Sequence, residues 1–294
     1  MVQTMLKPYR YKYISVLLLS MINVFFVATV NANSMVKTIE EVKQKLGADV
    51  GVSVYDVSSD DLWHYNGDTR FPLMSTFKTL ACAKLLADIH NGEQSFDTSV
   101  VIKKESLVTW SPVTEKHVGE SFSLRQACSA AMIMSDNTAA NIVLKGINGP
   151  TALTQFMRSI GDKITRLDRI EPYLGEALDG DVRDTTTPNA MVKSLRELLF
   201  GNTLPAASKT QLKQWMTDNK VSDSLLRSVL PIGWLIADRS GAGGYGSRGI
   251  TAVVWSEQRS PLIVAIYLTQ TDASFAQRNK AIAQIGKEIF TFYR

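Results

Sequence analysis

Valine-rich and apolar segments near the two ends of the chain predict β-strands. Residues 50–57 (VGVSVYDV) form the first, and an Asp60-Asp61 turn leads to a return strand over residues 62–65. Further segments of strand length lie near the other end, at residues 233–238, 250–255 and 262–269. An isolated hairpin is only marginally stable, so strands from both ends are expected to share one sheet.

Between these ends, apolar residues recur at the spacing of an amphipathic helix. The pattern predicts helices over residues 76–90, 124–134, 138–144, 152–160, 189–200, 208–219 and, at the end of the chain, 275–292. We therefore expect an α/β fold of the α+β type, with an antiparallel sheet of about five strands flanked by terminal helices and an inserted all-helical domain. The discontinuous α/β domain is placed at residues 33–68 and 218–294, and the helical domain at residues 69–217.

Residues 166–187 (RLDRIEPYLGEALDGDVRDTTT) match neither a helix nor a strand. A polar loop of this length inside a compact domain is usually functional. Arg169 and Asp184 are expected to pair across its neck. Glu171 is a candidate catalytic residue because a loop of this length calls for a functional explanation. The peptide bond before Pro172 is a candidate for the cis form.

The first 32 residues have the character of a secretory signal. Lys7, Arg10 and Lys12 precede an apolar stretch, and small residues at 30–32 offer a cleavage site. A retained membrane anchor is the alternative, because the apolar run approaches the length that spans a bilayer. Without those three basic residues the chain counts 29 basic against 28 acidic residues, which leaves no basic footprint for nucleic acid.

Export would place Cys82 and Cys128 in an oxidising compartment, where pairing is expected. Such a bridge closes a loop of about 46 residues and is worth on the order of 3–4 kcal/mol. The alternative is a pair of buried free thiols. Two cysteines and three scattered histidines supply a metal site poorly, so no metal is predicted.

Ser75 and Lys78 stand three residues apart at the start of the first predicted helix. That spacing puts the Lys78 ammonium on the same face as the Ser75 hydroxyl. Serine is a weak nucleophile without a base, and burial lowers the pKa of a lysine so that it can serve as one. On its own, the pair is more typical of a capping serine beside a surface lysine than of a nucleophile and its base.

Two further motifs carry polar groups. Ser135-Asp136-Asn137 lies between two predicted helices, where it fits either a helix N-cap or a hydroxyl and an amide directed into a cleft. The run at residues 239–246 (RSGAGGYG) follows a predicted strand and contains G-x-G-x-x-G. A strand rather than a helix is expected after it, so we reject a dinucleotide site.

The glycines of this run are interpreted as letting a strand edge approach a ligand closely. Arg239 and Arg248 would supply positive charge for an anionic substrate. The alternative is that both are ordinary surface arginines.

Together, Ser75-x-x-Lys78, Ser135-Asp136-Asn137, Glu171 and Arg239-Ser240-Gly241 resemble the motifs of class A serine β-lactamases in kind, order and spacing. The resemblance covers residues 40–292 and includes the cysteine pair. Arginine at 239, where the family usually has lysine, resembles the carbenicillin-hydrolysing subgroup; it holds charge but cannot give up its proton. Gly175 replaces an asparagine that usually helps to hold the deacylating water, so that water must be held in another way.

The resemblance implies β-lactam hydrolysis through a serine acyl-enzyme. Ser75 would attack, its proton passing to Lys78 or, through a water, to Glu171; Ser135 would protonate the departing nitrogen, and Glu171 would activate the deacylating water. The N–H groups of Ser75 and Ala242 would form the oxyanion hole. The expected substrate-binding residues are Trp110, Asn137, Arg239, Ser240, Gly241, Ala242 and Arg248.

The implied partners are small β-lactam substrates, chiefly penicillins including carbenicillin, and β-lactam inhibitors. No cofactor, nucleic acid or membrane partner is expected after signal removal; a monomer is the default, and the periplasm is the expected location in a Gram-negative bacterium. A penicillin-binding D,D-peptidase is an alternative that the Glu171 loop argues against. A β-lactam sensor that stays acylated is another, and the sequence offers it no membrane-spanning segment after residue 30.

Overall fold

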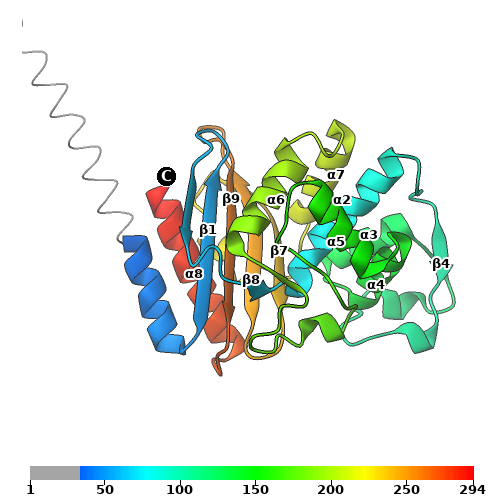
Figure 1. Ribbon diagram of the computed structural model, residues 1–294, viewed down its shortest axis with the longest axis horizontal. Coiled ribbons are helices and arrows are strands. Elements are labelled where there is room, and N and C mark those ends of the chain that lie inside the picture. The colour runs from blue at the N-terminus through cyan, green and yellow to red at the C-terminus, as the bar shows by residue number, and fades with distance from the viewer. Residues whose placement is uncertain (1–33) are drawn as a thin grey trace, which may run out of the picture.

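One antiparallel sheet of five strands forms the centre of the protein (Figure 1). The computed structural model describes residues 34–294, so the predicted signal at residues 1–32 lies outside the described residues. The sheet confirms the predicted fold, with the strand order β2-β1-β9-β8-β7. The strands are β1 (Asp49–Asp56), β2 (Leu62–Tyr65), β7 (Leu235–Ala242), β8 (Arg248–Trp255) and β9 (Leu262–Thr269).

The two ends of the chain meet where β1 pairs with β9. The pairing runs over the full length of both strands, from Asp49 opposite Thr269 to Asp56 opposite Leu262. Strand β7 is longer than predicted, because it continues past Asp238 to Ala242 and stays paired with β8 throughout. The motif at residues 239–242 therefore lies within an edge strand rather than after it.

Both faces of the sheet are buried. Alternate residues of a strand point to opposite faces. Val50, Val52 and Val54 of β1 pack with α8 (Phe275–Phe292) and with a helix at residues 34–46. Tyr55 of the same strand packs into the core shared with the helical unit. Because neither face meets water, the strands read as continuous apolar runs.

Helix α2 (Phe77–His90) is the central helix of the helical unit, and almost all of its residues are buried. It packs against α3 (Leu124–Ile133), α4 (Asn137–Gly146), α5 (Gly149–Ser159) and α7 (Ala206–Thr217). Helix α6 (Pro188–Phe200) lies between this unit and the sheet, against β1 and β9 (Figure 1). The exact domain boundaries at residues 68/69 and 217/218 stay a prediction.

Two short strand pairs were not predicted, because two or three residues carry no periodic pattern. Strand β3 (Phe71–Pro72) pairs with β6 (Thr185–Thr186), and β4 (Ser99–Val101) pairs with β5 (Ser121–Ser123). The first pair joins the end of the 166–187 loop to the chain just before Ser75. The 3₁₀ turns are η1 (Met74–Thr76), η2 (Lys104–Ser106), η3 (Thr114–His117), η4 (Tyr173–Gly175) and η5 (Leu226–Val229).

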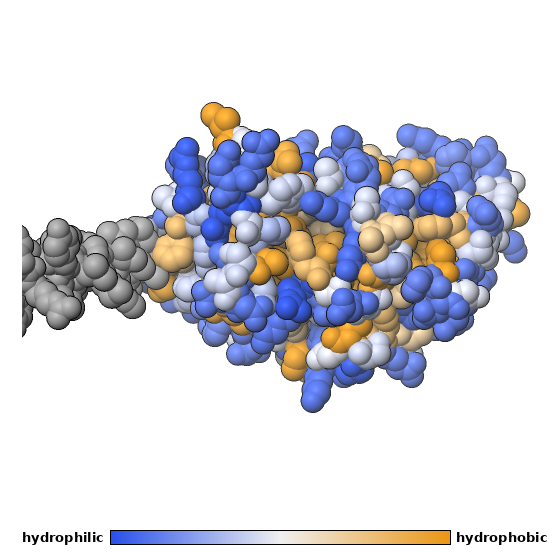
Figure 2. Space-filling model, turned by 90° about the horizontal axis from the view of Figure 1, so that it is seen from above, coloured by the Kyte–Doolittle hydropathy of each residue, from blue (hydrophilic) through white to orange (hydrophobic). Residues whose placement is uncertain are grey.

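The surface carries mainly polar side chains. The face seen in Figure 2 is largely hydrophilic, with small and separate apolar areas. Among residues 34–294, we find no helix with the length and apolar character needed to cross a membrane.

A disulfide bond joins Cys82 of α2 to Cys128 of α3, with the Cα atoms 5.8 Å apart. The predicted pairing is confirmed, and the alternative of two free thiols is wrong. The bridge ties the central helix to the helix that leads into Ser135.

We expect the double variant Cys82→Ala/Cys128→Ala to lose on the order of 3–4 kcal/mol in free energy of unfolding, because its unfolded chain regains the freedom of a loop of about 46 residues. Urea unfolding of the variant and of the oxidised wild type measures this difference. The reduced wild type is the control for the lost side-chain contacts. Equal midpoints for oxidised and reduced wild type would contradict the expectation.

Candidate active site

Ser75 lies in the turn η1, directly before α2. Strand β7 packs against this turn at Gly241, where an added Cβ would lie 2.7 Å from both Met74 Cβ and Ser75 N. Real Cβ atoms do not approach so closely, so position 241 must be glycine for the strand to reach the turn. Gly241 also lines the cavity next to Ser75, so the expected close approach to a ligand stays a prediction.

Lys78 is fully buried one turn after Ser75. Its ammonium donates to the carbonyl oxygen of Ser135 (2.8 Å), to Asn137 Oδ1 (2.6 Å) and to Ser135 Oγ (3.3 Å). It also forms an ion pair with Glu171 Oε1 at 3.5 Å. The alternative of a surface lysine is therefore wrong, and residues from three separate motifs meet at one nitrogen atom.

The environment of Lys78 makes its amine a weaker base than the amine of a free lysine. The Lys78 pKa is lowered to about 8: burial lowers it most, the Glu171 carboxylate acts in the opposite direction, and the nearby Arg239 charge adds to the lowering. A lysine with this pKa is partly neutral in mildly alkaline solution, and only the neutral amine can accept a proton.

The Ser135-Asp136-Asn137 motif serves both as a helix N-cap and as a source of polar side chains at the site, because different residues of the motif have these two roles. Asp136 is the N-cap of α4, and its carboxylate accepts the Ala139 N–H at 2.8 Å. Ser135 has φ +59°, a strained conformation for a residue with a side chain. This turn brings both Ser135 Oγ and Asn137 Oδ1 to the Lys78 ammonium.

Trp110 stands beside this turn with 58% of its surface exposed. Its backbone carbonyl accepts the Asn137 N–H at 2.9 Å, and its indole N–H donates to Met134 O at 3.1 Å. Both contacts tie the loop that carries the indole to the Ser135 turn.

Glu171 is only 6% exposed, although it belongs to the long loop. The peptide bond to Pro172 is cis, as predicted. Asn141 of α4 clamps the Glu171 main chain from both sides: its Oδ1 accepts the Glu171 N–H and its Nδ2 donates to the Glu171 carbonyl, each at 2.9 Å. The carboxylate is thus held toward Lys78 rather than turned to solvent.

Arg239 and Arg248 are 1% and 3% exposed, so the alternative of ordinary surface arginines is wrong. Arg239 donates to Met132 O at 2.8 Å, and Arg248 donates to Gly241 O at 2.9 Å and to Asn279 Oδ1 at 2.8 Å. Burial lowers the pKa of each guanidinium to about 10, which leaves both charged at neutral pH. Among residues 34–294, neither forms an ion pair with a carboxylate, so their charge is available to an anion.

The predicted residues enclose one cavity of about 280 Å³. Its wall contains the Ser75 hydroxyl and two guanidinium groups, which suits an anionic substrate of small-molecule size. Lys78 and Glu171 are not part of its wall and lie next to it, behind Ser135 and Asn137. The lining residues are Ser75, Trp110, Ser135, Asn137, Val221, Arg239, Ser240, Gly241, Ala242, Arg248 and Phe275.

A larger cavity of about 590 Å³ lies elsewhere and includes none of the predicted site residues. Lys45, Tyr245 and Thr271 are among its walls. Within residues 34–294, no group of three or more histidine, cysteine, aspartate or glutamate side chains is placed to hold a metal ion. The smaller cavity is therefore the better candidate for chemistry.

Comparison with known proteins agrees with this geometry. The profile of the β-lactamase enzyme family matches residues 34–293. The chain is 58% identical over 252 residues to β-lactamase CARB-4 of Pseudomonas aeruginosa, covering 86% of this chain and 88% of that protein. The chain belongs to the β-lactamase enzyme family.

Two other similar proteins are also β-lactamases. The AER-1 enzyme of Aeromonas hydrophila is 51% identical over 88% of this chain and 86% of its own. The crystal structure of the chromosome-encoded β-lactamase of Vibrio parahaemolyticus is 55% identical, with a TM-score of 0.87 over 88% of this chain and 99% of that one.

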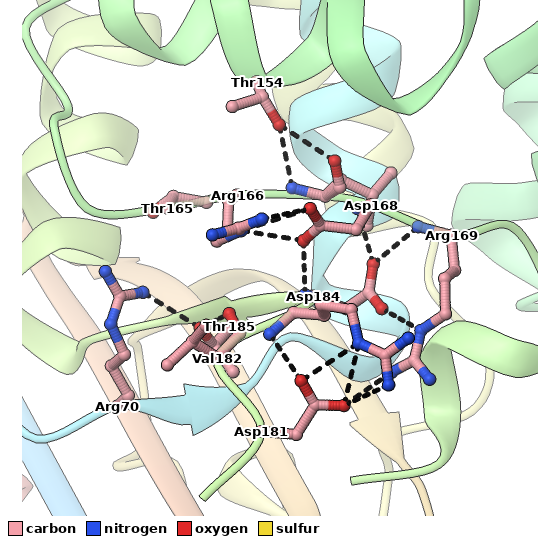
Figure 3. A network of polar contacts seen from close by, with 12 residues as sticks. Arg70, Thr154, Thr165, Arg166, Asp168, Arg169, Asp181, Val182, Asp184 and Thr185 are labelled. Atoms are coloured by element: carbon pink, nitrogen blue, oxygen red, sulfur yellow. Dashed lines mark hydrogen bonds and ion pairs between the residues drawn. The ribbon is translucent and has the colours of Figure 1, made fainter.

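In this β-lactamase, Asp184 fastens the neck of the 166–187 loop (Figure 3). Its carboxylate accepts the backbone N–H groups of Asp168 (2.7 Å) and Arg169 (2.9 Å), and it pairs with Arg169 Nε at 2.5 Å, which confirms the predicted pair. Asp168 returns the contact by accepting the Asp184 N–H at 3.0 Å. The hydrogen bond from Arg166 holds the Asp168 pKa below its usual range, so this carboxylate stays charged.

The sequence did not reveal several residues of the site. Asn141 holds Glu171, Asn279 holds Arg248, and Val221 and Phe275 line the cavity. Asn141 is four residues after Asn137 on a helix, which places both side chains on one face. This spacing was the one local signal that could have identified Asn141 as a site residue. The other three come from segments that only the folded chain brings together.

We expect Asp184→Asn to lower the free energy of unfolding by about 1.5–3 kcal/mol, because a buried carboxylate that pairs with Arg169 is replaced by a neutral amide. Turnover should also fall, since the loop presents Glu171. Urea unfolding and β-lactam hydrolysis measure the two effects. Asp179→Asn, an exposed change on the same loop, is the matched control; equal behaviour of the two variants would argue against the role of the neck.

Proposed function

We propose that this β-lactamase hydrolyses the amide bond of β-lactam antibiotics, chiefly penicillins including carbenicillin, and so confers resistance to them. The observation that carries the proposal is the buried Lys78 ammonium, which contacts Ser135 and Asn137 and pairs with Glu171 one turn after Ser75. The shared cavity supplies positive charge for the carboxylate of the substrate.

In the acylation step, the oxygen of Ser75 bonds to the lactam carbonyl carbon while its proton passes to Lys78. The N–H groups of Ser75 and Ala242 stabilise the oxyanion. The carbon–nitrogen bond of the ring then breaks as Ser135 gives its proton to the nitrogen and takes the proton held by Lys78, which returns the lysine to its neutral form. The lowered pKa of Lys78 supports its choice as base over Glu171 acting through a water.

The substrate is held by its charges and its amide. Arg239, Ser240 and Arg248 bind the carboxylate, and Asn137 binds the side-chain amide. Trp110 forms the rim of the entrance, and Gly241 lies along the bound ring. The guanidinium groups suit a carboxylate because they present paired N–H donors.

In the deacylation step, Glu171 takes a proton from a water that attacks the ester carbon, and that proton passes on to Ser75 as its bond to the carbon breaks, which restores the hydroxyl and the carboxylate. Gly175 lies on the same loop, and a Cβ added there would meet no atom within 4 Å. We propose that solvent fills this space and that the Glu171 carboxylate and backbone groups hold the water that an asparagine side chain holds in most of the family.

The chain is proposed to act as a monomer exported to the periplasm, without a cofactor. Its relatives from Pseudomonas aeruginosa and Aeromonas hydrophila are proteins of Gram-negative bacteria, which supports the location. β-Lactam inhibitors are expected to enter the same cavity.

We expect Glu171→Gln to accumulate a covalent penicillin adduct, because the amide cannot take the proton of the water. The deacylation rate should fall by about 10²–10⁴-fold. Intact-protein mass spectrometry after mixing detects the adduct. Ser75→Ala is the control and should show none.

Multiple turnovers of a chromogenic cephalosporin by the wild type separate hydrolysis from two alternatives. A sensor stays acylated after one turnover, and a D,D-peptidase deacylates slowly. A single-turnover burst without further hydrolysis would refute the proposed function.

The acylation rate should rise with pH below about 8 and level off above it, because Lys78 accepts the proton only in its neutral form and its pKa is about 8. Rapid-quench acylation of the wild type by a slow penicillin, measured from pH 6 to 9.5, reports this pH dependence; in Glu171→Gln the rise should move to lower pH, because the carboxylate that raises the Lys78 pKa is absent. A rate that is flat over this range, or an acylation abolished by Glu171→Gln, would assign the proton to Glu171 instead.

A further inference from the structure

The ring of Phe275 lies near two guanidinium groups in the wall of the cavity. The guanidinium carbon of Arg248 is 4.7 Å from the ring centroid, and that of Arg278 is 5.5 Å from it. Phe275 is the first residue of α8 and also lines the cavity that contains Ser75. We propose that Phe275 is a positioning residue for substrate recognition: its ring fixes Arg248 for the β-lactam carboxylate, a role that rests on the proposed function.

Hydrogen bonds alone leave Arg248 incompletely held. Its Nε donates to Asn279 Oδ1 at 2.8 Å and its Nη1 to Gly241 O at 2.9 Å, while Nη2 has no hydrogen-bond partner within residues 34–294. Nη2 is therefore the group left for a substrate. The ring of Phe275 covers the guanidinium, which restricts its tilt and excludes water from it.

Repulsion between cations makes this support necessary. Burial and the charges of Arg239 and Arg278 all lower the pKa of Arg248. The face of an aromatic ring carries partial negative charge and attracts a cation on either side. Phe275 thus offsets part of the repulsion between Arg248 and Arg278 by attracting both guanidinium groups.

Arg278 also lies over the ring of Phe275. Its Nη1 donates to Ser247 O at 3.2 Å, whereas its buried Nε has no hydrogen-bond partner in the described part of the chain. With one backbone contact, its place depends strongly on the ring. The ring and the two guanidinium groups belong to α8 and β8, so the packing of these two elements fixes all three groups.

The test compares Phe275→Leu, which keeps apolar bulk without an aromatic face, with Phe275→Tyr, which keeps the face. Benzylpenicillin and its methyl ester, which lacks the carboxylate, are the two substrates. Phe275→Leu should raise KM for benzylpenicillin by about three- to tenfold and leave kcat within about twofold, because the lost contact acts on binding. Phe275→Tyr should restore the wild-type KM, and the ester should be hydrolysed alike by all three proteins.

Phe292→Leu, at the other end of α8, is the matched control for a change in the helix. An unchanged KM in Phe275→Leu, an equal loss in Phe275→Tyr, or an equal effect on the methyl ester would overturn the proposal. Phe275 is half exposed, and thermal unfolding of each variant checks that it folds. Failure of the wild type to hydrolyse benzylpenicillin would instead refute the proposed function, so the two failures are distinguishable.

Discussion

The buried ammonium of Lys78 is the constraint around which the site is organised. Removing a charge from water is costly unless polar groups surround it. Here the partners come from the Ser135-Asp136-Asn137 turn and from Glu171 of the loop. Each partner needs its own support: Asp136 fastens the turn and Asn141 fastens the loop. The capped helix α4, the strained turn at Ser135 and the loop that carries Glu171 therefore all position groups around the Lys78 nitrogen atom.

Features written in local sequence could be predicted. The periodic helices, the apolar strands and the Ser75/Lys78 spacing depend on neighbours within a few residues, and the loop was visible because it lacked any such pattern. The end of β7 was missed because Arg239, Ser240 and Gly241 interrupt the apolar run, although all three are buried in the folded chain. Whether a polar residue is buried can be judged only when the groups that form hydrogen bonds with it are known.

Residues that act through distant partners remained hidden. Asn279 and Phe275 of α8 meet Arg248 only because β8 and α8 pack together. Gly241 was noticed as a cavity residue, but the sequence did not show that it also packs against the turn at Ser75, where a Cβ would clash. A sequence reports that a position needs a small residue and does not report which surface makes it so.

The double clamp of Asn141 on Glu171 has a consequence for how the enzyme can change. Asn141 and Asn137 lie one turn apart on α4. The same helix therefore carries the side chain that binds Lys78 and the side chain that holds the Glu171 main chain, and this rigid rod moves both together. A mutation that tilts this rod to admit a bulkier drug disturbs both halves of the catalytic cycle together. Adaptation through α4 is therefore costly, and evolutionary variation should concentrate on the opposite rim of the cavity.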